Sequence, residues 1–173
     1  MRQAWVLRLL AACAVIGLTL TVAAADEGTS TFTASLSGFN EVAPILSDGT
    51  GTFHARIHGN SLTYTETFSN LHSSVTQSHI HFAQRGVNGG VFLFLCSNLG
   101  NGPAGTPACP AGGGTVTRTV TAADFVTVAA QNVPANSFTS AVRILRSGDA
   151  YANVHTAAFP GGEIRGQINF GDN

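Results

Sequence analysis

Apolar and polar residues alternate along most of the chain after residue 30, which is the pattern of β-strands that are buried on one face. The alternation predicts strands over residues 31–36, 52–57, 61–68, 78–82, 115–120, 149–156 and 163–170. The run over 91–95 is apolar without interruption, so we expect this strand on the inside of a sheet. Gly59-Asn60 is a two-residue turn that joins the second and third strands. The chain is therefore predicted to be mainly β.

Between residues 121 and 147 the apolar spacing changes to that of helices. Thr121 to Asp124 resembles a capping box, with Asp in place of the usual Glu or Gln, and predicts a short helix that ends at Pro134. Asn136 or Ser137 would cap a second helix that ends at Gly148. We therefore expect an antiparallel β-sandwich or barrel with one or two short helices in the crossover before the last hairpin.

The first 25 residues have the pattern of a secretory signal peptide: Arg2 and Arg8, then an uncharged apolar run, then Ala23-Ala24-Ala25. An uncleaved membrane anchor is the competing interpretation, but an apolar run of about 17 residues is at the short limit for spanning a bilayer. We expect a secreted, periplasmic or envelope protein with a flexible leader over 26–31, one domain over 32–170 and a tail over 171–173. No later segment predicts a membrane span.

The charge of the chain argues against a nucleic-acid partner. The formal net charge is −1, and the loss of Arg2 and Arg8 with the signal peptide makes the remainder more acidic. The remaining arginines are scattered, whereas a nucleic-acid site requires a basic stripe.

The cysteines predict a disulfide. Cys13 lies in the predicted signal peptide, which leaves Cys96 and Cys109. Two cysteines in an exported chain favour a bridge, which would stabilise the fold by about 3 kcal/mol in the chain-entropy model. The alternative, a pair of thiolates that binds a metal, is less expected outside the cytosol.

The clearest chemical signal is the pair His79 and His81. Residues two apart in a strand share one face, so both imidazoles can reach one ion. We expect both rings to point inward, toward the strand that carries His155, the natural third ligand. Glu163 is a fourth candidate ligand, or a partner that orients a ring.

A structural interpretation competes with the metal site. The polar residues of the last hairpin would then form a buried hydrogen-bond network that satisfies itself: Tyr151, Asn153, His155, Glu163 and Arg165. The spacing of the residues leaves both interpretations open. His54 and His58 are too far apart in a strand to chelate one ion, and His72 is expected in a surface loop.

Two further carboxylates have no evident role. Glu41 lies in an irregular corner and is expected to be solvated, and Glu66 interrupts an apolar face, so we expect it near an edge. The sequence contains no G-x-S-x-G, P-loop or H-E-x-x-H motif, and no catalytic residues are predicted.

Three segments resemble the CHRD domain, named for chordin, in order and spacing: A-S-L-S-G-F-N-E-V-A-P at 34–44, S-H-I-H-F-A-Q-R-G-V-N-G-G-V at 78–91 and Y-A-N-V-H-T-A-A-F-P-G-G-E-I-R-G-Q-I at 151–168. The resemblance covers residues 32–170 and implies an extracellular or envelope β-sandwich without an established enzymatic activity. Residues 97–114 depart from a minimal family pattern.

H-I-H before a glycine-rich turn is also similar to a strand of the copper–zinc superoxide dismutases, β-sandwiches in which two such histidines bind copper. Only His79 and His81 carry over, because no bridging histidine, zinc site or active-site arginine follows in matching order. We therefore expect an immunoglobulin-like or dismutase-like β fold. The leading functional hypothesis is an exported module without catalysis that binds a protein or small ligand, with copper or zinc at His79, His81 and His155. The alternatives are a metalloenzyme of the superoxide dismutase type and a purely structural envelope domain.

Overall fold

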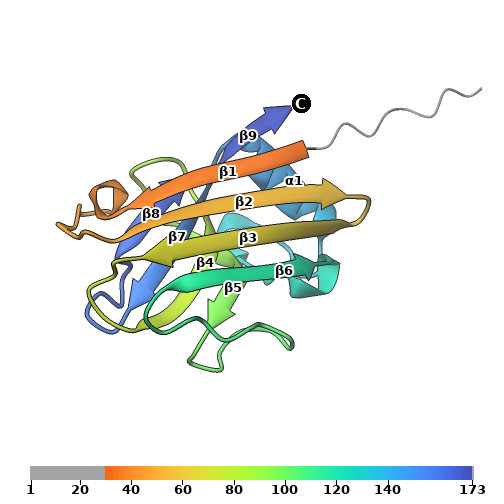
Figure 1. Ribbon diagram of the computed structural model, residues 1–173. Helices are drawn as coiled ribbons and strands as arrows, with labels where there is room; N and C mark the ends of the chain where they lie inside the picture. Colours follow the sequence, from red (N-terminus) through yellow and green to blue (C-terminus); the bar gives the residue numbers. More distant parts are fainter. Residues whose placement is uncertain (1–29, 173) are drawn as a thin grey trace, which may run out of the picture.

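The computed structural model describes residues 30–172 (Figure 1). The predicted signal peptide and most of the leader lie outside the described residues. The strands are β1 (Ser30–Ser37), β2 (Thr50–His58), β3 (Ser61–Ser69), β4 (Val75–Phe82), β5 (Gly90–Ser97), β6 (Gly114–Val120), β7 (Ala150–Thr156), β8 (Ile164–Gln167) and β9 (Asn169–Asp172). The helix α1 spans Phe138–Ser147, and three short 3-10 turns span Gly38–Asn40, Ala122–Asp124 and Ala129–Gln131.

All strand pairs are antiparallel, and their order is β5-β4-β7-β8-β1-β2-β3-β6, with β9 also paired to β1. The sheet folds into two layers: β1, β2, β3 and β6 lie in front in Figure 1, and β4, β5, β7 and β8 lie behind. The terminal strands β5 and β6 contact each other, so the sheet is a nearly closed barrel. The predicted mainly β sandwich or barrel is confirmed.

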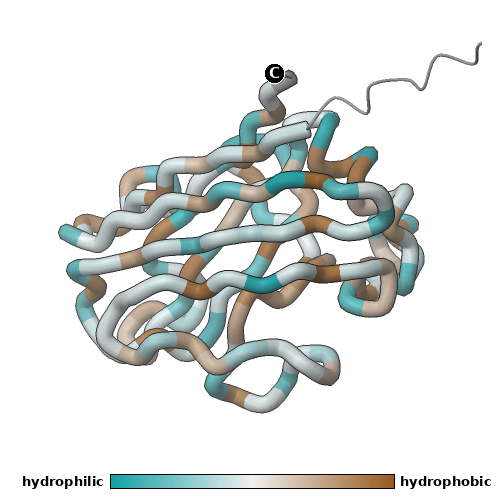
Figure 2. Tube along the Cα trace, turned by 45° about the vertical axis from the view of Figure 1, so that its right-hand side comes forward, coloured by the Kyte–Doolittle hydropathy of each residue, from teal (hydrophilic) through white to brown (hydrophobic). Residues whose placement is uncertain are grey.

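The front layer follows the predicted alternation, which Figure 2 shows along its strands. On the inner side of β1, Phe32 and Ala34 pair with Ala55 and Phe53 of β2, and all four are buried. The outer side is polar, and the threonines of β3 and β6 hydrogen-bond in cross-strand pairs at 2.8–3.0 Å. Burial of alternate apolar residues thus fixes the register of this layer.

The rear layer is different because its strand β7 is buried on both faces. The inner face carries Ala152 and Val154, which belong to the hydrophobic core. The outer face carries polar side chains and is covered by three loops, residues 38–45, 83–89 and 157–163. This covered polar face positions the candidate site.

The second predicted helix is confirmed, and the first is wrong. Ser137 caps α1 by accepting a hydrogen bond from the backbone N–H of Ser140 at 3.3 Å, and Gly148 ends it with a left-handed φ of 78°. The capping box at Thr121–Asp124 holds only a single 3-10 turn. After it, Phe125 forms an isolated bridge to Leu93 of β5, so the chain is extended where a helix was expected.

This extended segment also explains how β5 can be buried although it ends the strand order. We expected residues 91–95 on the inside of a sheet, but β5 is the last strand in the order, so that prediction is wrong. Its second edge is covered, because the N–H of Val126 donates to the carbonyl oxygen of Phe92 at 3.0 Å. The apolar pattern reported burial correctly but could not distinguish a neighbouring strand from an irregular segment.

The predicted last strand divides into two. β8 pairs with β7, and β9 pairs with β1. The break lies at Ile168, whose N–H donates to the carbonyl oxygen of Ala150 at 2.8 Å. Strand β1 also pairs with β8 at Ser37 and Arg165, so it pairs with strands of both layers, β2 in front and β8 behind.

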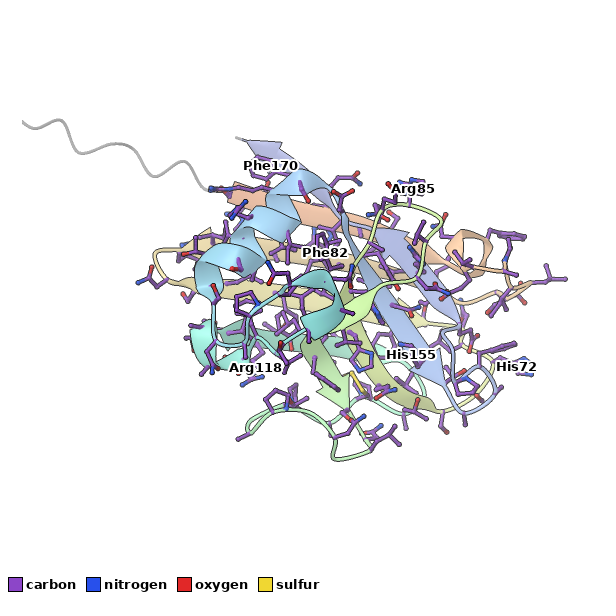
Figure 3. The ribbon with its side chains drawn as sticks, turned by 180° about the vertical axis from the view of Figure 1, so that it is seen from behind. His72, Phe82, Arg85, Arg118, His155 and Phe170 are labelled. Carbon is purple, nitrogen blue, oxygen red and sulfur yellow. A yellow bond between two sulfur atoms is a disulfide. The ribbon has the colours of Figure 1, made fainter. Side chains whose placement is uncertain are left out.

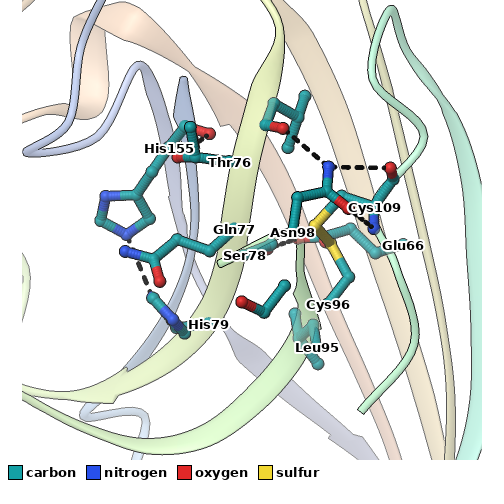
Figure 4. The surroundings of a disulfide bond; sticks show 12 residues. Glu66, Thr76, Gln77, Ser78, His79, Leu95, Cys96, Asn98, Cys109 and His155 are labelled. Carbon is teal, nitrogen blue, oxygen red and sulfur yellow. Dashed lines mark hydrogen bonds between the residues drawn. A yellow bond between two sulfur atoms is a disulfide. The ribbon is translucent and has the colours of Figure 1, made fainter. Parts of the chain in front are cut away.

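The predicted disulfide between Cys96 and Cys109 is present (Figure 4). It closes the glycine- and proline-rich loop between β5 and β6. The side chain of Asn98 holds the same loop, because its Nδ2 donates to the carbonyl oxygens of Val75 and Cys109 at 2.9 and 3.1 Å.

Candidate metal centre

Three histidines meet on the outer face of the rear layer. His79 and His81 extend from β4, and His155 extends from the neighbouring strand β7. Side chains two residues apart in a strand share a face, and His79 and His81 lie opposite Asn153 and Tyr151, which share a face of β7 with His155. The three rings therefore lie on the face opposite the hydrophobic core. Each ring is buried, and one ligand atom from each lies within 4.8 Å of the other two. Figure 3 shows His155 within this layer, whereas His72 lies at its periphery.

The direction of the histidines differs from the expectation. We expected the rings to point into the interior between the layers, but that side is occupied by Ser78 and Ile80, which face the core. The trio instead lies beneath the covering loops. The strand pattern predicts which residues share a face, but it does not say which face is covered by loops.

Hydrogen bonds fix the protons on two of the three rings. The Nδ1 atom of His81 lies 2.9 Å from the carbonyl oxygen of Gly89, and that of His155 lies 3.0 Å from the carbonyl oxygen of Pro160. A carbonyl oxygen only accepts, so both Nδ1 atoms donate. The Nε2 atoms of His81 and His155 therefore carry lone pairs.

The position of the proton on the third ring, His79, follows from that on His155. The Nδ1 atom of His79 lies 3.2 Å from Nε2 of His155, which must accept, so Nδ1 of His79 donates. Its Nε2 then also carries a lone pair. The Nε2 atoms of His79 and His81 are both buried without a hydrogen-bond partner among the described residues. Two basic nitrogens of the trio are thus left without a partner, whereas the lone pair of the third, Nε2 of His155, accepts the hydrogen from Nδ1 of His79.

The three imidazoles are neutral at pH 7. Burial, together with the neighbouring imidazoles of His155 and His81, lowers the pKa of His79 to about 3, and burial lowers that of His81 to about 4. Burial also lowers the pKa of His155. Neutral imidazole is the form that binds a metal, so the protonation state of the trio is compatible with metal binding.

An aromatic and cationic stack holds His81 in place. The ring of His81 lies parallel to that of Tyr151, with centroids 4.6 Å apart and planes 3° apart. The guanidinium carbon of Arg165 lies 3.3 Å from the same tyrosine centroid. Arg165 in turn donates to the carbonyl oxygen of Val87 at 2.7 Å and to Oδ1 of Asn88 at 3.1 Å. The stack therefore joins the site to the 83–89 loop.

Asn153 and Glu41 form a second support. Asn153 lies opposite both His79 and Arg165 on its neighbouring strands, and its Nδ2 donates to Oε1 of Glu41 at 2.6 Å. A side chain at Gly162 would collide with this pair, because a Cβ there would lie 2.6 Å from Nδ2 of Asn153. Glu41 was expected to be solvated, but it is buried, and burial raises its pKa to about 7.

Glu163 does not join the trio. Its Oε1 accepts from Oγ of Ser47 and from the backbone N–H of His72, both at 2.7 Å. Its Oε2 accepts from Oγ1 of Thr156 at 2.7 Å. Thr156 and His155 are adjacent in β7 and point to opposite faces, so the Glu163 carboxylate lies on the other side of the strand.

The sequence did not identify several groups that shape the site. The groups that orient His81 and His155 are the backbone carbonyl oxygens of Gly89 and Pro160. Backbone groups occur in every residue, so the sequence does not mark them. Phe94 also packs edge-on against His79, with ring centroids 4.5 Å apart. His54, His58 and His72 are exposed and contribute nothing to the trio, as expected.

Within residues 30–172, no other group of three or more His, Cys, Asp or Glu residues is placed to hold an ion. The structure therefore provides no counterpart to the zinc site of the dismutases. No helix in the described part of the chain has the length and apolar character needed to cross a membrane.

Comparisons with known proteins agree with the motifs. No curated protein and no solved structure matches the chain. The family model of the CHRD domain matches residues 32–168. This range includes all three segments that suggested the resemblance, the histidine trio and the disulfide. The chain belongs to the CHRD domain family.

Proposed function

We propose that this CHRD domain is an exported, non-catalytic binding module that holds one copper or zinc ion at His79, His81 and His155. The observation that carries the proposal is the pair of buried Nε2 atoms of His79 and His81, which have no partner among the described residues. A buried acceptor without a partner destabilises a protein by about 1–3 kcal/mol. A metal ion that accepts these lone pairs would remove that penalty. His155 would become the third ligand when its Nε2 gives up the hydrogen bond from Nδ1 of His79 and turns to the ion.

The alternative of a purely structural polar network accounts for the neighbours of the trio but not for the trio itself. Tyr151, Asn153 and Arg165 each have hydrogen-bond or stacking partners. Within the trio, Nε2 of His79 and Nε2 of His81 have none; elsewhere in the described residues, Oε2 of Glu66 and Oε1 of Gln167 are also buried without a partner. The carbonyls of Gly89 and Pro160 orient two of the rings through their Nδ1 atoms, and such outer contacts commonly accompany metal-binding histidines.

Export is supported by the disulfide and by the family. A disulfide such as Cys96–Cys109 persists in oxidising compartments and is rare in the cytosol. The pattern of residues 1–25 is that of a signal peptide, although these residues lie outside the described part of the chain. A partner of the module, a protein or a small ligand, is consistent with the absence of a catalytic motif.

Superoxide dismutation is a weaker candidate. His79, His81 and His155 are 3%, 8% and 6% exposed, so a substrate would have to pass the covering loops to reach an ion. The chemistry would also lack the second metal of the copper–zinc enzymes. We therefore assign no turnover to the site.

Metal analysis of the exported protein, prepared without a histidine tag, tests the proposal. The protein is loaded with copper or zinc and dialysed, and bound metal is measured by elemental analysis. We expect one ion per chain in the wild type and none in His79→Ala/His81→Ala. The matched control His54→Ala/His58→Ala changes two exposed histidines of β2 and should retain the ion.

The outcomes separate the hypotheses. Binding that persists in His79→Ala/His81→Ala would overturn the site, and a folded wild type that binds no ion would favour the structural network. Circular dichroism checks the fold, and His81→Gln provides a milder variant if the double change unfolds the protein. Superoxide turnover by the copper-loaded protein would overturn the non-catalytic part of the proposal.

A further inference from the structure

The ligand set of the trio carries no negative charge. Its three members are imidazoles, and within residues 30–172 no carboxylate or cysteine is close enough to join them. Glu163 is engaged on the other side of β7, and Glu66 accepts a hydrogen bond from Ser78 on the core side of β4 at 2.9 Å. An ion at the trio would therefore keep its full charge.

The surroundings of the trio do not compensate that charge. The outer face of the rear layer contains one buried carboxylate, Glu41, and one buried guanidinium, Arg165, which attract each other. Arg165 stacks on Tyr151, and Tyr151 stacks on His81, so only one aromatic ring separates the positive group from one of the ligands. Phe94 adds an apolar wall beside His79.

The free-energy cost of burying an ion beside the trio rises steeply with the charge of the ion. The free energy needed to move an ion from water into a medium of low dielectric constant rises with the square of its charge. For a divalent ion it is about four times that of a monovalent ion of equal radius. Repulsion by Arg165 also doubles for a divalent ion. Structural zinc sites usually add a fourth ligand, which the described residues do not supply at the trio.

On the basis of the proposed function, we infer that the trio selects monovalent copper, Cu(I), over Cu(II) and Zn(II). Imidazole is an accepted copper ligand. With three neutral nitrogen ligands, a bound Cu(I) ion gives a buried complex of net charge +1, whereas Cu(II) or Zn(II) gives +2. The soft sulfur ligands that usually select Cu(I) are absent from the trio, so charge and burial make the choice here.

Competition titrations test this selectivity. The exported protein is titrated anaerobically with Cu(I) buffered by a chromophoric chelator, and separately with Cu(II) and Zn(II) in chelators of known affinity. We expect Cu(I) to bind more tightly than Zn(II) by on the order of 100-fold. Binding of Zn(II) or Cu(II) that depends on the histidines and equals that of Cu(I) would overturn the inference but leave the proposed function intact. No histidine-dependent binding of any ion would remove both.

Variants of Arg165 test the physical cause. Arg165→Gln removes the charge and should raise the affinity for Zn(II) more than that for Cu(I), which lowers the selectivity. Arg165→Lys keeps the charge and loses the planar stacking, so it should retain most of the selectivity. Arg56→Gln removes an exposed arginine of β2, in the other layer, and should leave the selectivity unchanged. Equal selectivity in Arg165→Gln and the wild type would contradict the electrostatic explanation.

Discussion

His81 donates its Nδ1 hydrogen to the carbonyl oxygen of Gly89 over 2.9 Å, and this bond ties the trio to the loop that covers it. A Cβ at Gly89 would lie 1.9 Å from the carbonyl oxygen of Phe82. Gly89→Ala must therefore shift the loop and its carbonyl. We expect a loss of about 2–3 kcal/mol in the free energy of unfolding, measured in urea, together with weaker metal binding.

Gly86 provides the control for this change. It lies in the same loop at a φ of +77°, and an added Cβ there would meet nothing within 4 Å. Gly86→Ala should destabilise the protein by about 1 kcal/mol through the left-handed backbone alone. Its metal affinity should match that of the wild type. If the two variants bind metal equally well, the Gly89 carbonyl does not orient the site.

Metal affinity should depend little on pH from 7.5 down to about 5, apart from a smaller effect of Glu41, whose pKa is raised to about 7 by burial. The pKa values of His79 and His81 are lowered by burial to about 3 and about 4, so protons do not compete for these rings until the solution is strongly acidic. A solvated histidine site would begin to lose affinity below its ordinary pKa of about 6.5. Competition titrations at several pH values check this prediction, and a tenfold loss per pH unit below 6.5 would contradict it.

Glu66 should make the ion-free protein less stable as the pH rises. Its pKa is raised from 4.5 to about 8 by burial, so between these values the folded state holds a proton that the unfolded state has released. Stability falls across this window by up to about 1.4 kcal/mol per pH unit. Glu66→Gln cannot titrate, and the stability difference between Glu66→Gln and the wild type should therefore grow from pH 5 to pH 8. Urea unfolding at each pH measures it, and a constant difference would show that Glu66 is ionised in the fold.

Much of the fold was predictable because its signals are local. The alternation at Phe32, Ala34 and Leu36 specifies one buried face, and Ser137 and Gly148 specify the ends of α1. The trio was predictable for a similar reason. His79 and His81 share a face through their spacing, and the polar row of the last hairpin pointed to His155.

The failed predictions concern contacts that the local sequence does not record. Phe125 has helical spacing with its neighbours but lies extended along β5, because the edge of that strand needs a partner. Glu66 lies in the middle of the front layer rather than at an edge, and its partner is Ser78 of the other layer. Glu41 reaches Asn153 from a loop 112 residues away in the sequence. Partners of buried polar groups follow from the tertiary fold, so hydropathy patterns do not identify them.

Glu163 stabilises the fold without serving the metal. Its carboxylate accepts three hydrogen bonds at 2.7 Å, from Ser47, from the backbone of His72 and from Thr156. Glu163→Gln removes the negative charge and leaves one accepting oxygen for Ser47 and His72, while its amide nitrogen would face the Thr156 hydroxyl, which can accept. We expect a loss of about 1–2 kcal/mol in the free energy of unfolding. Thr156→Val removes one of the three donors and also the acceptor of the Phe159 N–H, and it should destabilise the protein by about 1–2 kcal/mol. Both variants should keep the wild-type metal affinity at a temperature where they remain folded. A large loss of metal binding in Glu163→Gln, but not in Thr156→Val, would place Glu163 in the metal site after all.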